Sequence, residues 1–219
     1  MKKLVIIPTY KEKENIQLIV DAVFNLGQQY HLLIIDDNSP DGTADIVKSM
    51  QQLHPQELFL VERAGKLGLG TAYIAGFEWA LVNGYDFIFE MDADFSHDPS
   101  DLERLYDACH TSGADMAVGS RYVSGGKIEN WPLSRKLISK AGALYSKLIT
   151  WLPVNDATAG FVCYSRKVLA TMDLKSIRFV GYAFQIEMKF SAWKLGFKIK
   201  EVTITFRDRK FGASKMTKG

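Results

Sequence analysis

Cysteine is nearly absent from this sequence of 219 residues, which contains only Cys109 and Cys163. Two isolated cysteines exclude a disulfide framework and a cysteine-rich zinc site, and they are typical of a reducing compartment. The four histidines are scattered without the spacing of metal ligands. The composition therefore predicts a cytoplasmic protein that is held together by an ordinary hydrophobic core.

Long apolar runs are also missing. The apolar run at residues 4–7 is too short for a signal peptide, and no segment approaches the ~20 apolar residues of a membrane span. A net charge of +2 gives no reason to expect nucleic acid as the main partner. The sequence ends at residues 217–219 without a closing element, which suggests a further carboxyl-terminal tail. We therefore expect a soluble or peripheral protein.

Several nucleotide-binding and catalytic signatures are absent as well. Gly68 and Gly70 do not have the G-x-G-x-x-G spacing of a dinucleotide site, and no Walker lysine-serine pair or serine nucleophile elbow is present. We expect these two glycines to form a tight turn with close backbone packing, with ligand contact as the alternative.

The first half of the sequence alternates between strand and helix patterns. Apolar runs predict buried strands at residues 4–7, 32–35, 58–61, 87–91 and 116–119. Amphipathic spacing predicts one helix that begins near Ile16. It predicts three further helices, at residues 43–53, 71–82 and 101–109. Short connections in this order predict an α/β fold with a mostly parallel twisted sheet flanked by helices.

The alternation stops after Gly119. The sequence then predicts a loop at 120–132, an amphipathic helix at 133–152, a strand at 160–164, a helix at 184–194 and an edge strand at 198–206. Leu137, Ala141, Leu144 and Leu148 fall on one face of the long helix. We expect one domain of residues 1–219, in which residues 1–122 form a nucleotide half and residues 123–219 an acceptor half.

Polar clusters follow three of the predicted strands, at residues 8–12, 36–39 and 92–94. The carboxyl ends of parallel strands share one edge of a sheet, where α/β proteins bind ligands. Asp92 and Asp94 are two residues apart, so both side chains point the same way on extended backbone. Such hard oxygen ligands suit Mg²⁺ or Mn²⁺ beside substrate phosphates. The alternative is a solvated turn that caps the next helix, but three clusters together favour a site.

Cationic residues form a second group. Arg121 follows the fifth strand, and Arg135 and Ser139 share a helix face because they are four residues apart. Arg209 and Lys215 lie near the end of the sequence. A solvated basic surface is the alternative, but cations beside a metal suit a diphosphate leaving group and an anionic acceptor.

Several of these stretches together resemble the family 2 glycosyltransferases. The stretches that carry this resemblance are residues 8–15, 36–43, 68–73, 91–97 and 119–122. Those at residues 129–132, 135–139, 184–188 and 208–215 resemble, more narrowly, the dolichyl-phosphate (polyprenyl-phosphate) mannose synthases. The resemblance covers essentially the whole chain and implies a glycosyltransferase fold of A type.

This resemblance implies GDP-mannose as donor, Mg²⁺ or Mn²⁺ as cofactor and a polyprenyl (dolichyl) monophosphate as acceptor. It implies that the donor is held by Pro8, Tyr10, Glu12, Ile35, Asp37, Asp92, Ala93, Asp94, Arg121, Arg209 and Lys215. The metal ligands would be Asp92, Asp94 and Ser96, although some members carry glutamine at the last position. Arg121, Arg135 and Ser139 would bind the acceptor phosphate, and with Asp94 they would be the catalytic residues.

The expected reaction is a direct, inverting attack by the lipid phosphate on the sugar, which gives a β-linkage. A phosphate monoester has a second pKa near ~6, so we expect no protein base. The Q-x-x-R-W signature of polymerising relatives is absent. A UDP-glucose-dependent polyprenyl-phosphate glucosyltransferase and a catalytically silent nucleotide-sugar-binding protein are the alternatives.

Two expectations concern the surroundings of the site. The helix at 133–152 has apolar and basic faces, so we expect peripheral contact with the cytoplasmic face of a membrane, with a core helix as the alternative. Residues 208–215 contain glycine and small residues, and we expect them to form a mobile lid over the donor.

Overall fold

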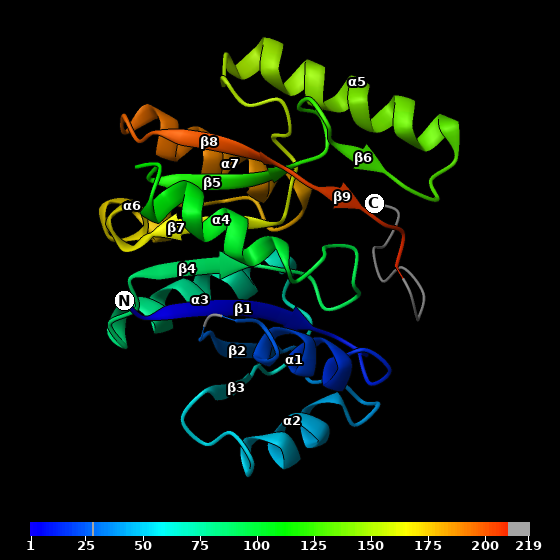
Figure 1. The fold of residues 1–219 in the computed structure, drawn as a ribbon, viewed down its shortest axis with the longest axis vertical. Helices are drawn as coiled ribbons and strands as arrows, with labels where there is room; N and C mark the ends of the chain where they lie inside the picture. Colours follow the sequence, from blue (N-terminus) through cyan, green and yellow to red (C-terminus); the bar gives the residue numbers. More distant parts are fainter. Residues whose placement is uncertain (28, 210–219) are drawn as a thin grey trace.

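Seven strands form the central sheet, and the computed structural model describes residues 1–27 and 29–209 of the chain (Figure 1). The strands lie in the order β3-β2-β1-β4-β7-β5-β8. Neighbouring strands are parallel except where β7 pairs with β4 and β5. Their bounds are β1 (Lys3–Thr9), β2 (His31–Asp36), β3 (Leu58–Glu62), β4 (Phe87–Glu90), β5 (Met116–Ser120), β7 (Val162–Ser165) and β8 (Ile199–Thr203). The predicted α/β fold with a mostly parallel sheet is confirmed.

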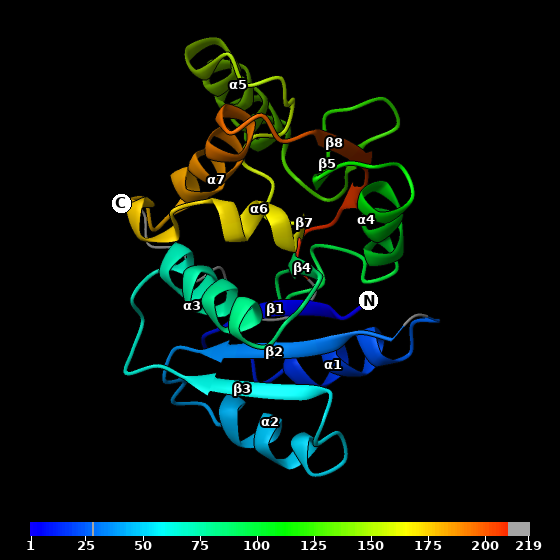
Figure 2. The ribbon, with the colours of Figure 1, turned by 90° about the vertical axis from the view of Figure 1, so that its left-hand side faces the viewer.

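Each strand contributes to two hydrophobic cores because alternate side chains point to opposite faces of the sheet. In β1, Val5 and Ile7 join one core, and Leu4 and Ile6 join the other. The first core includes residues of α1 (Ile16–Phe24), α2 (Thr43–Gln51) and α4 (Asp101–His110). The second includes residues of α3 (Leu69–Val82), α6 (Arg166–Thr171) and α7 (Tyr182–Lys194), with the short helix η1 (Leu174–Ser176) close by. Helices therefore cover both faces of the sheet (Figure 2).

Strand β7 runs against its neighbours and brings a new segment to the carboxyl edge of the sheet. Val162, its first residue, pairs with Glu90 near the end of β4 and with Val118 in β5. The residues that precede β7, from Asp156 to Gly160, therefore lie at the same edge as the ends of the parallel strands. The sequence predicts this strand, but its place between β4 and β5 could not be read from the sequence.

The edge strand predicted at residues 198–206 is instead two strands in two sheets. β8 ends at Thr203, and β9 (Thr205–Phe206) pairs with β6 (Lys127–Ile128). Ile204 lies between them, buried in the first core, and its N–H donates to the Ser120 carbonyl. This break takes the chain out of the central sheet, and β9 lies beside β6 (Figure 1). The predicted loop at 120–132 contains β6.

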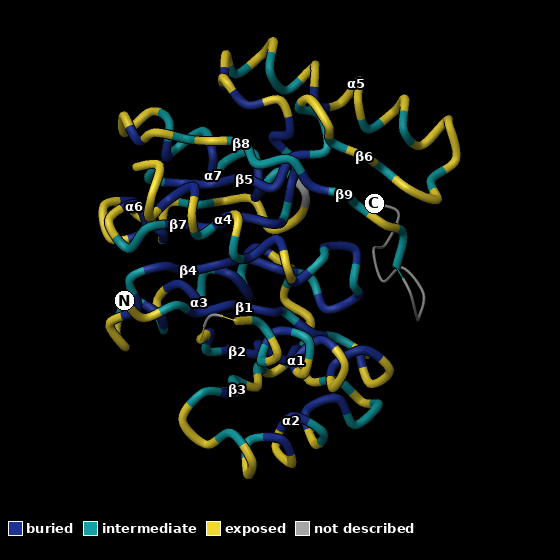
Figure 3. The backbone as a smooth tube through the Cα atoms, viewed as in Figure 1, coloured by how far each residue is buried: buried dark blue, intermediate teal, exposed yellow. Residues whose placement is uncertain are grey.

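Helix α5 (Leu133–Thr150) lies outside both cores, and Figure 3 shows it as mostly exposed. Ala143 is its one buried residue. The predicted apolar face exists, but it points outward: Leu137, Leu144 and Leu148 are 61%, 58% and 66% exposed. The alternative that α5 is a core helix is therefore wrong. Among the described residues, none of the helices is both long enough and apolar enough to cross a membrane.

Candidate active site

The polar strand ends line one cavity of about 780 Å³. Thr9 ends β1, Asp37 follows β2, and Asp92 follows β4, and all three line this cavity. The predicted residues that also line it are Pro8, Tyr10, Glu12, Ala93, Asp94, Ser96, Arg121, Arg135, Ser139 and Arg209. Ile35 does not, because its side chain is buried in the second core. Lys215 lies outside the described residues.

At the β1 and β2 end of the cavity, acidic side chains are fixed by hydrogen bonds. Asp37 accepts from Nε of Arg63 at 2.6 Å, and the same guanidinium reaches the Thr71 hydroxyl at 2.8 Å. Glu12 accepts from the Asn15 amide at 2.8 Å. These carboxylates could accept hydrogen bonds from the N–H groups of a base or from ribose hydroxyls.

Gly68 and Gly70 form the tight packing that the sequence predicts. A Cβ on Gly70 would lie 2.7 Å from the Phe179 carbonyl oxygen and 2.8 Å from the Phe184 ring, so only glycine fits without a shift. Gly68 has a φ of +103° and also lines the cavity, which brings backbone close to the ligand position.

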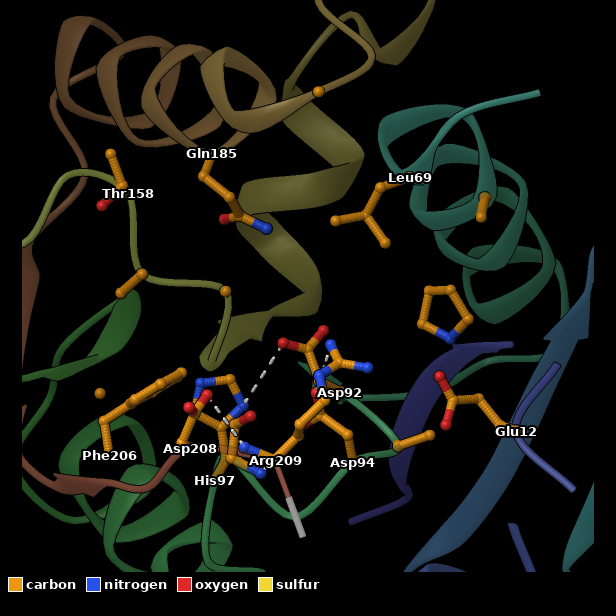
Figure 4. Close-up of a pocket in the computed structure, with 18 of the residues that line it drawn as sticks. Glu12, Leu69, Asp92, Asp94, His97, Thr158, Gln185, Phe206, Asp208 and Arg209 are labelled. Carbon is orange, nitrogen blue, oxygen red and sulfur yellow. Dashed lines mark hydrogen bonds and ion pairs between the residues drawn. The ribbon is translucent and has the colours of Figure 1, made fainter. Parts of the chain in front are cut away.

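Asp92 and Asp94 lie side by side in the middle of the cavity (Figure 4). Oδ1 of Asp94 accepts from the Ser96 N–H at 3.0 Å, and its Oδ2 lies 3.0 Å from Nη2 of Arg209. Partial removal of the Asp92 carboxylate from solvent in the cavity, followed by the negative charges of Asp94 and Glu90, raises the pKa of Asp92. A cation at this position would relieve that repulsion and keep both carboxylates ionised.

The donor set fits a divalent cation that binds together with a phosphate. No three Asp, Glu, His or Cys side chains converge as a metal site within residues 1–27 and 29–209. Mg²⁺ needs no such protein cage, because it keeps several waters and takes its remaining oxygens from substrate phosphates. Asp92 and Asp94 would supply the carboxylates, and Ser96 lies on the same cavity wall.

His97 forms an aromatic part of the cavity wall. Its ring stacks on Phe161 with centroids 4.8 Å apart and meets the edge of Phe206 at 5.4 Å. Nδ1 lies 4.0 Å from Oδ2 of Asp92 and has no hydrogen-bond partner among the described residues. Burial lowers the pKa of His97 to about 4, so the ring is neutral at physiological pH.

Arg121 is held in a fixed orientation by a carboxylate that the sequence analysis did not identify. Asp156, which is fully buried, accepts from Nε and Nη2 of Arg121 at 2.7 Å each and from its backbone N–H at 3.0 Å. Thr158 accepts from the same Nη2 at 3.1 Å. Such a two-pronged pair aims the guanidinium as well as neutralising its charge.

Arg135 and Ser139 are residues of α5, and both line the cavity. They lie on one side of that helix, as their spacing predicts. The Tyr122 hydroxyl donates to Oγ of Ser139 at 2.7 Å. The Arg135 guanidinium lies 3.9 Å from the centre of the Trp131 ring and 3.3 Å from Asp208. Both side chains are thus positioned by neighbours from other elements.

The end of the described chain returns over this site. Arg207 pairs with Asp98 and Glu129, and Arg209 pairs with Asp94 (Figure 4). The predicted lid at 208–215 lies outside the described residues beyond Arg209, so it stays a prediction.

Sequence reasoning assigned no role to three side chains of the site region. Arg63 orients Asp37, Asp156 orients Arg121, and Gln185 of α7 lines the cavity beside Thr158. The stretch 155–160 combines polar and small residues directly before a strand, and that pattern could have pointed to Asp156. Gln185 lies in the stretch 184–188 that carries the resemblance, where it had no assigned role, and Arg63 carries no comparable local signal.

An open α/β sheet with an Asp-x-Asp pair at its carboxyl edge, and arginines lining the same cavity, fits a nucleotide-sugar transferase. Comparison with known proteins agrees. Residues 4–172 match the family described as Glycosyl transferase family 2. The chain belongs to this family and is a glycosyltransferase.

Two curated relatives are each 46% identical to this chain. One is a polyprenol monophosphomannose synthase of Mycolicibacterium smegmatis, matched over 99% of this chain and 81% of the relative. The other is an undecaprenyl-phosphate mannosyltransferase of Micrococcus luteus, matched over 100% and 89%. Their names agree with the narrower resemblance found in the sequence.

Among solved structures, a mannosyltransferase of Pyrobaculum calidifontis in complex with GDP-Man and Mn²⁺ has a TM-score of 0.63. It is 15% identical, and the match covers 95% of this chain and 56% of that chain. At this identity the likeness concerns the fold, which is that of a glycosyltransferase.

Proposed function

We propose that this protein transfers mannose from GDP-mannose to a polyprenyl monophosphate, with inversion, to give polyprenyl phosphate β-mannose and GDP. The observation that carries the proposal is one cavity with acidic strand ends at one end and Arg121, Arg135 and Ser139 at the other. The Asp92–Asp94 pair lies between them. The names of the two relatives that are 46% identical support the choice of sugar and acceptor.

The donor lies along the strand ends in this proposal. Pro8, Tyr10, Glu12 and Asp37 surround the guanosine, because their hydrogen-bonding groups line the cavity at the β1 and β2 end. Residues 1–122 then hold the nucleotide and metal, and residues 123–219 supply most of the acceptor side. A structure of similar fold that contains GDP-Man supports the nucleotide.

The diphosphate lies at Asp92 and Asp94 together with Mg²⁺ or Mn²⁺. When bound, the cation neutralises the charge that develops on the departing GDP. The two carboxylates would hold it, and Ser96 lines the same cavity. Arg209, 3.0 Å from Asp94 here, is within reach of a phosphate oxygen at the same place.

The acceptor phosphate binds to the cations at the α5 side. Arg121 is fixed by Asp156, and Arg135 and Ser139 offer further donors. A phosphate oxygen forms the new bond to the anomeric carbon as the bond to the GDP oxygen breaks. The phosphate is largely dianionic at neutral pH because its second pKa is near ~6, so no residue has to remove a proton.

The lipid tail of the acceptor requires contact with a membrane, and we propose α5 as the contact surface. Leu137, Leu144 and Leu148 point away from the protein, while Arg135 and Ser139 on the same helix line the cavity. The exposed Lys140 lies beside this apolar face. An interfacial helix with such faces would place the phosphate in the cavity while its tail stays in lipid.

A donor panel tests this proposal. Purified protein is incubated with polyprenyl phosphate in detergent, with Mg²⁺ or Mn²⁺, and with GDP-mannose, UDP-glucose or GDP-glucose in turn. Mannosyl lipid and GDP formed from GDP-mannose alone would support the proposal. Preferential use of UDP-glucose would establish a glucosyltransferase instead, and no turnover with any donor would favour a silent binding protein.

A further inference from the structure

A chain of buried polar groups lies behind the cavity and has no role in the reaction as described. Glu90 and Lys189 are completely buried, and Gln185 between them is 2% exposed. The Gln185 amide nitrogen donates to Glu90, which also accepts from the Tyr164 hydroxyl at 2.9 Å. Such a network is costly to bury, so we asked what its orientation achieves.

The contacts of Lys189 fix the direction of the Gln185 amide. Its ammonium group has three N–H donors and no acceptor. The three acceptors are the Ala159 carbonyl at 2.7 Å, the Gln185 carbonyl at 3.1 Å and Oε1 of Gln185 at 3.0 Å. The amide oxygen must therefore face Lys189, and the amide nitrogen must face Glu90.

The orientation leaves a donor for the cavity. An amide nitrogen carries two N–H groups, and within residues 1–27 and 29–209 Glu90 is the one acceptor that it meets. Gln185 lines the cavity, and in Figure 4 its amide end points into the space above Asp92, between Thr158 and Leu69. The network thus presents one N–H of fixed direction to a bound molecule.

The order of the strands locates this N–H relative to the ligand. The nucleoside end lies at β1 and β2, the diphosphate at the end of β4, and Arg121 at the end of β5. Gln185 contacts Glu90 of β4 on one side and, through Lys189, Ala159 just before β7 on the other. Strand β7 lies between β4 and β5, so Gln185 lies between the diphosphate and the acceptor phosphate. In a linear nucleotide sugar, the sugar occupies that interval.

We propose that Gln185 is a specificity-determining residue that donates its second amide N–H to a hydroxyl of the transferred sugar. This inference rests on the proposed function, because it assumes a nucleotide-sugar donor. Glu90 and Lys189 are positioning residues that hold the amide in one orientation.

The test compares affinity for the nucleotide with affinity for the nucleotide sugar. Gln185→Met removes both N–H groups at similar length, and Gln185→Glu keeps an acceptor for Lys189 if the first variant folds poorly. Calorimetry with metal should show GDP affinity within about 2-fold of wild type and GDP-mannose affinity reduced about 10-fold, as expected for one hydrogen bond. With donors that lack one sugar hydroxyl, the variant and wild type should become equal for the deoxy position that Gln185 contacts.

Tyr164→Phe is the matched control, because it removes the other hydrogen bond to Glu90 from a side chain that does not line the cavity. It should leave both affinities within about 2-fold. If Gln185→Met weakens GDP and GDP-mannose equally, or if every deoxy donor separates wild type from variant by the same factor, the inference is wrong. The proposed function is tested separately, with the wild-type protein in the donor panel. If the wild type does not use GDP-mannose there, the proposed function is wrong. The calorimetry is then carried out with the donor that the wild type does use.

Discussion

Asp94 has two separate contacts, one with the Ser96 N–H and one with Arg209. Asparagine at this position keeps an oxygen for Ser96 and loses the negative charge. We expect Asp94→Asn to lower turnover about 100-fold or more, because Asp94 would help to hold a cation that would contribute several kcal/mol to stabilising the transition state. The unfolding midpoint should change little. Asp86→Asn, directly before β4 and away from the cavity, should retain full activity. Near-wild-type turnover of Asp94→Asn with Mg²⁺ would refute the metal assignment.

Arg135 offers a test that separates acceptor from donor. The guanidinium lines the α5 side of the cavity, away from the strand ends assigned to the nucleotide. Arg135→Ala should raise the KM for polyprenyl phosphate about 10- to 100-fold, because a charge-assisted hydrogen bond contributes roughly 1.5–3 kcal/mol. GDP affinity by calorimetry should stay within about 2-fold. Arg104→Ala, an exposed arginine of α4 that does not line the cavity, is the control. An equal loss of GDP affinity in Arg135→Ala would place Arg135 at the donor.

His97 predicts a pH dependence of stability. Burial lowers its pKa from 6.5 to about 4, so protonation favours the unfolded chain. The free energy of unfolding is therefore highest above pH 6.5, where His97 is neutral in both the folded and the unfolded chain. It decreases as the pH falls towards 4, because the unfolded chain takes up a proton at this residue first. Between pH 7 and pH 5 this loss amounts to about 2 kcal/mol. In urea unfolding, the free energy of unfolding of His97→Phe should therefore fall by about 2 kcal/mol less than that of wild type between pH 7 and pH 5. Identical pH profiles would show that His97 does not cause the loss.

Helix α5 differs from every other long helix in the described part of the chain, because its apolar face is exposed. Leu144 and Leu148 can therefore be replaced by serine at little cost, within about 0.5 kcal/mol each in urea unfolding. Co-sedimentation of the double variant with anionic vesicles should fall about 10-fold or more, because each leucine contributes ~1.5–3 kcal/mol when buried. Val82→Ser, an exposed apolar residue at the end of α3, is the control. Unchanged vesicle binding would exclude α5 as the contact surface.

The elements of the first half were accessible from sequence because each satisfies one periodic pattern. The runs that become β1, β2 and β4 are buried on both faces. The first aspartate after the β4 run, Asp92, shows in the sequence that this strand has ended. The break at Ile204 could not be foreseen, since residues 198–206 alternate as one strand would. Only the tertiary position of Ile204, buried beside Ser120, divides that strand in two.

Across the whole molecule, the site is formed by segments that only the topology brings together. The sequence located the acidic strand ends and Arg121, because parallel strands must share one edge. It could not place Asp156 or Gln185 beside their partners, because their positions depend on β7 lying antiparallel between β4 and β5. Residues whose partners are distant in sequence, such as Gln185 and Glu90, are specified by this arrangement and not by a local pattern.

The central claim is that the attacking group is a lipid phosphate that needs no protein base. It is tested most directly by comparing a polyprenyl phosphate with the corresponding free polyprenol in the same vesicles, using GDP-mannose labelled in the sugar. We predict labelled lipid from the phosphate only, a β-linkage by NMR, and loss of the product when the metal is chelated. Transfer to the free alcohol at a similar rate, or an α-linked product, would contradict it.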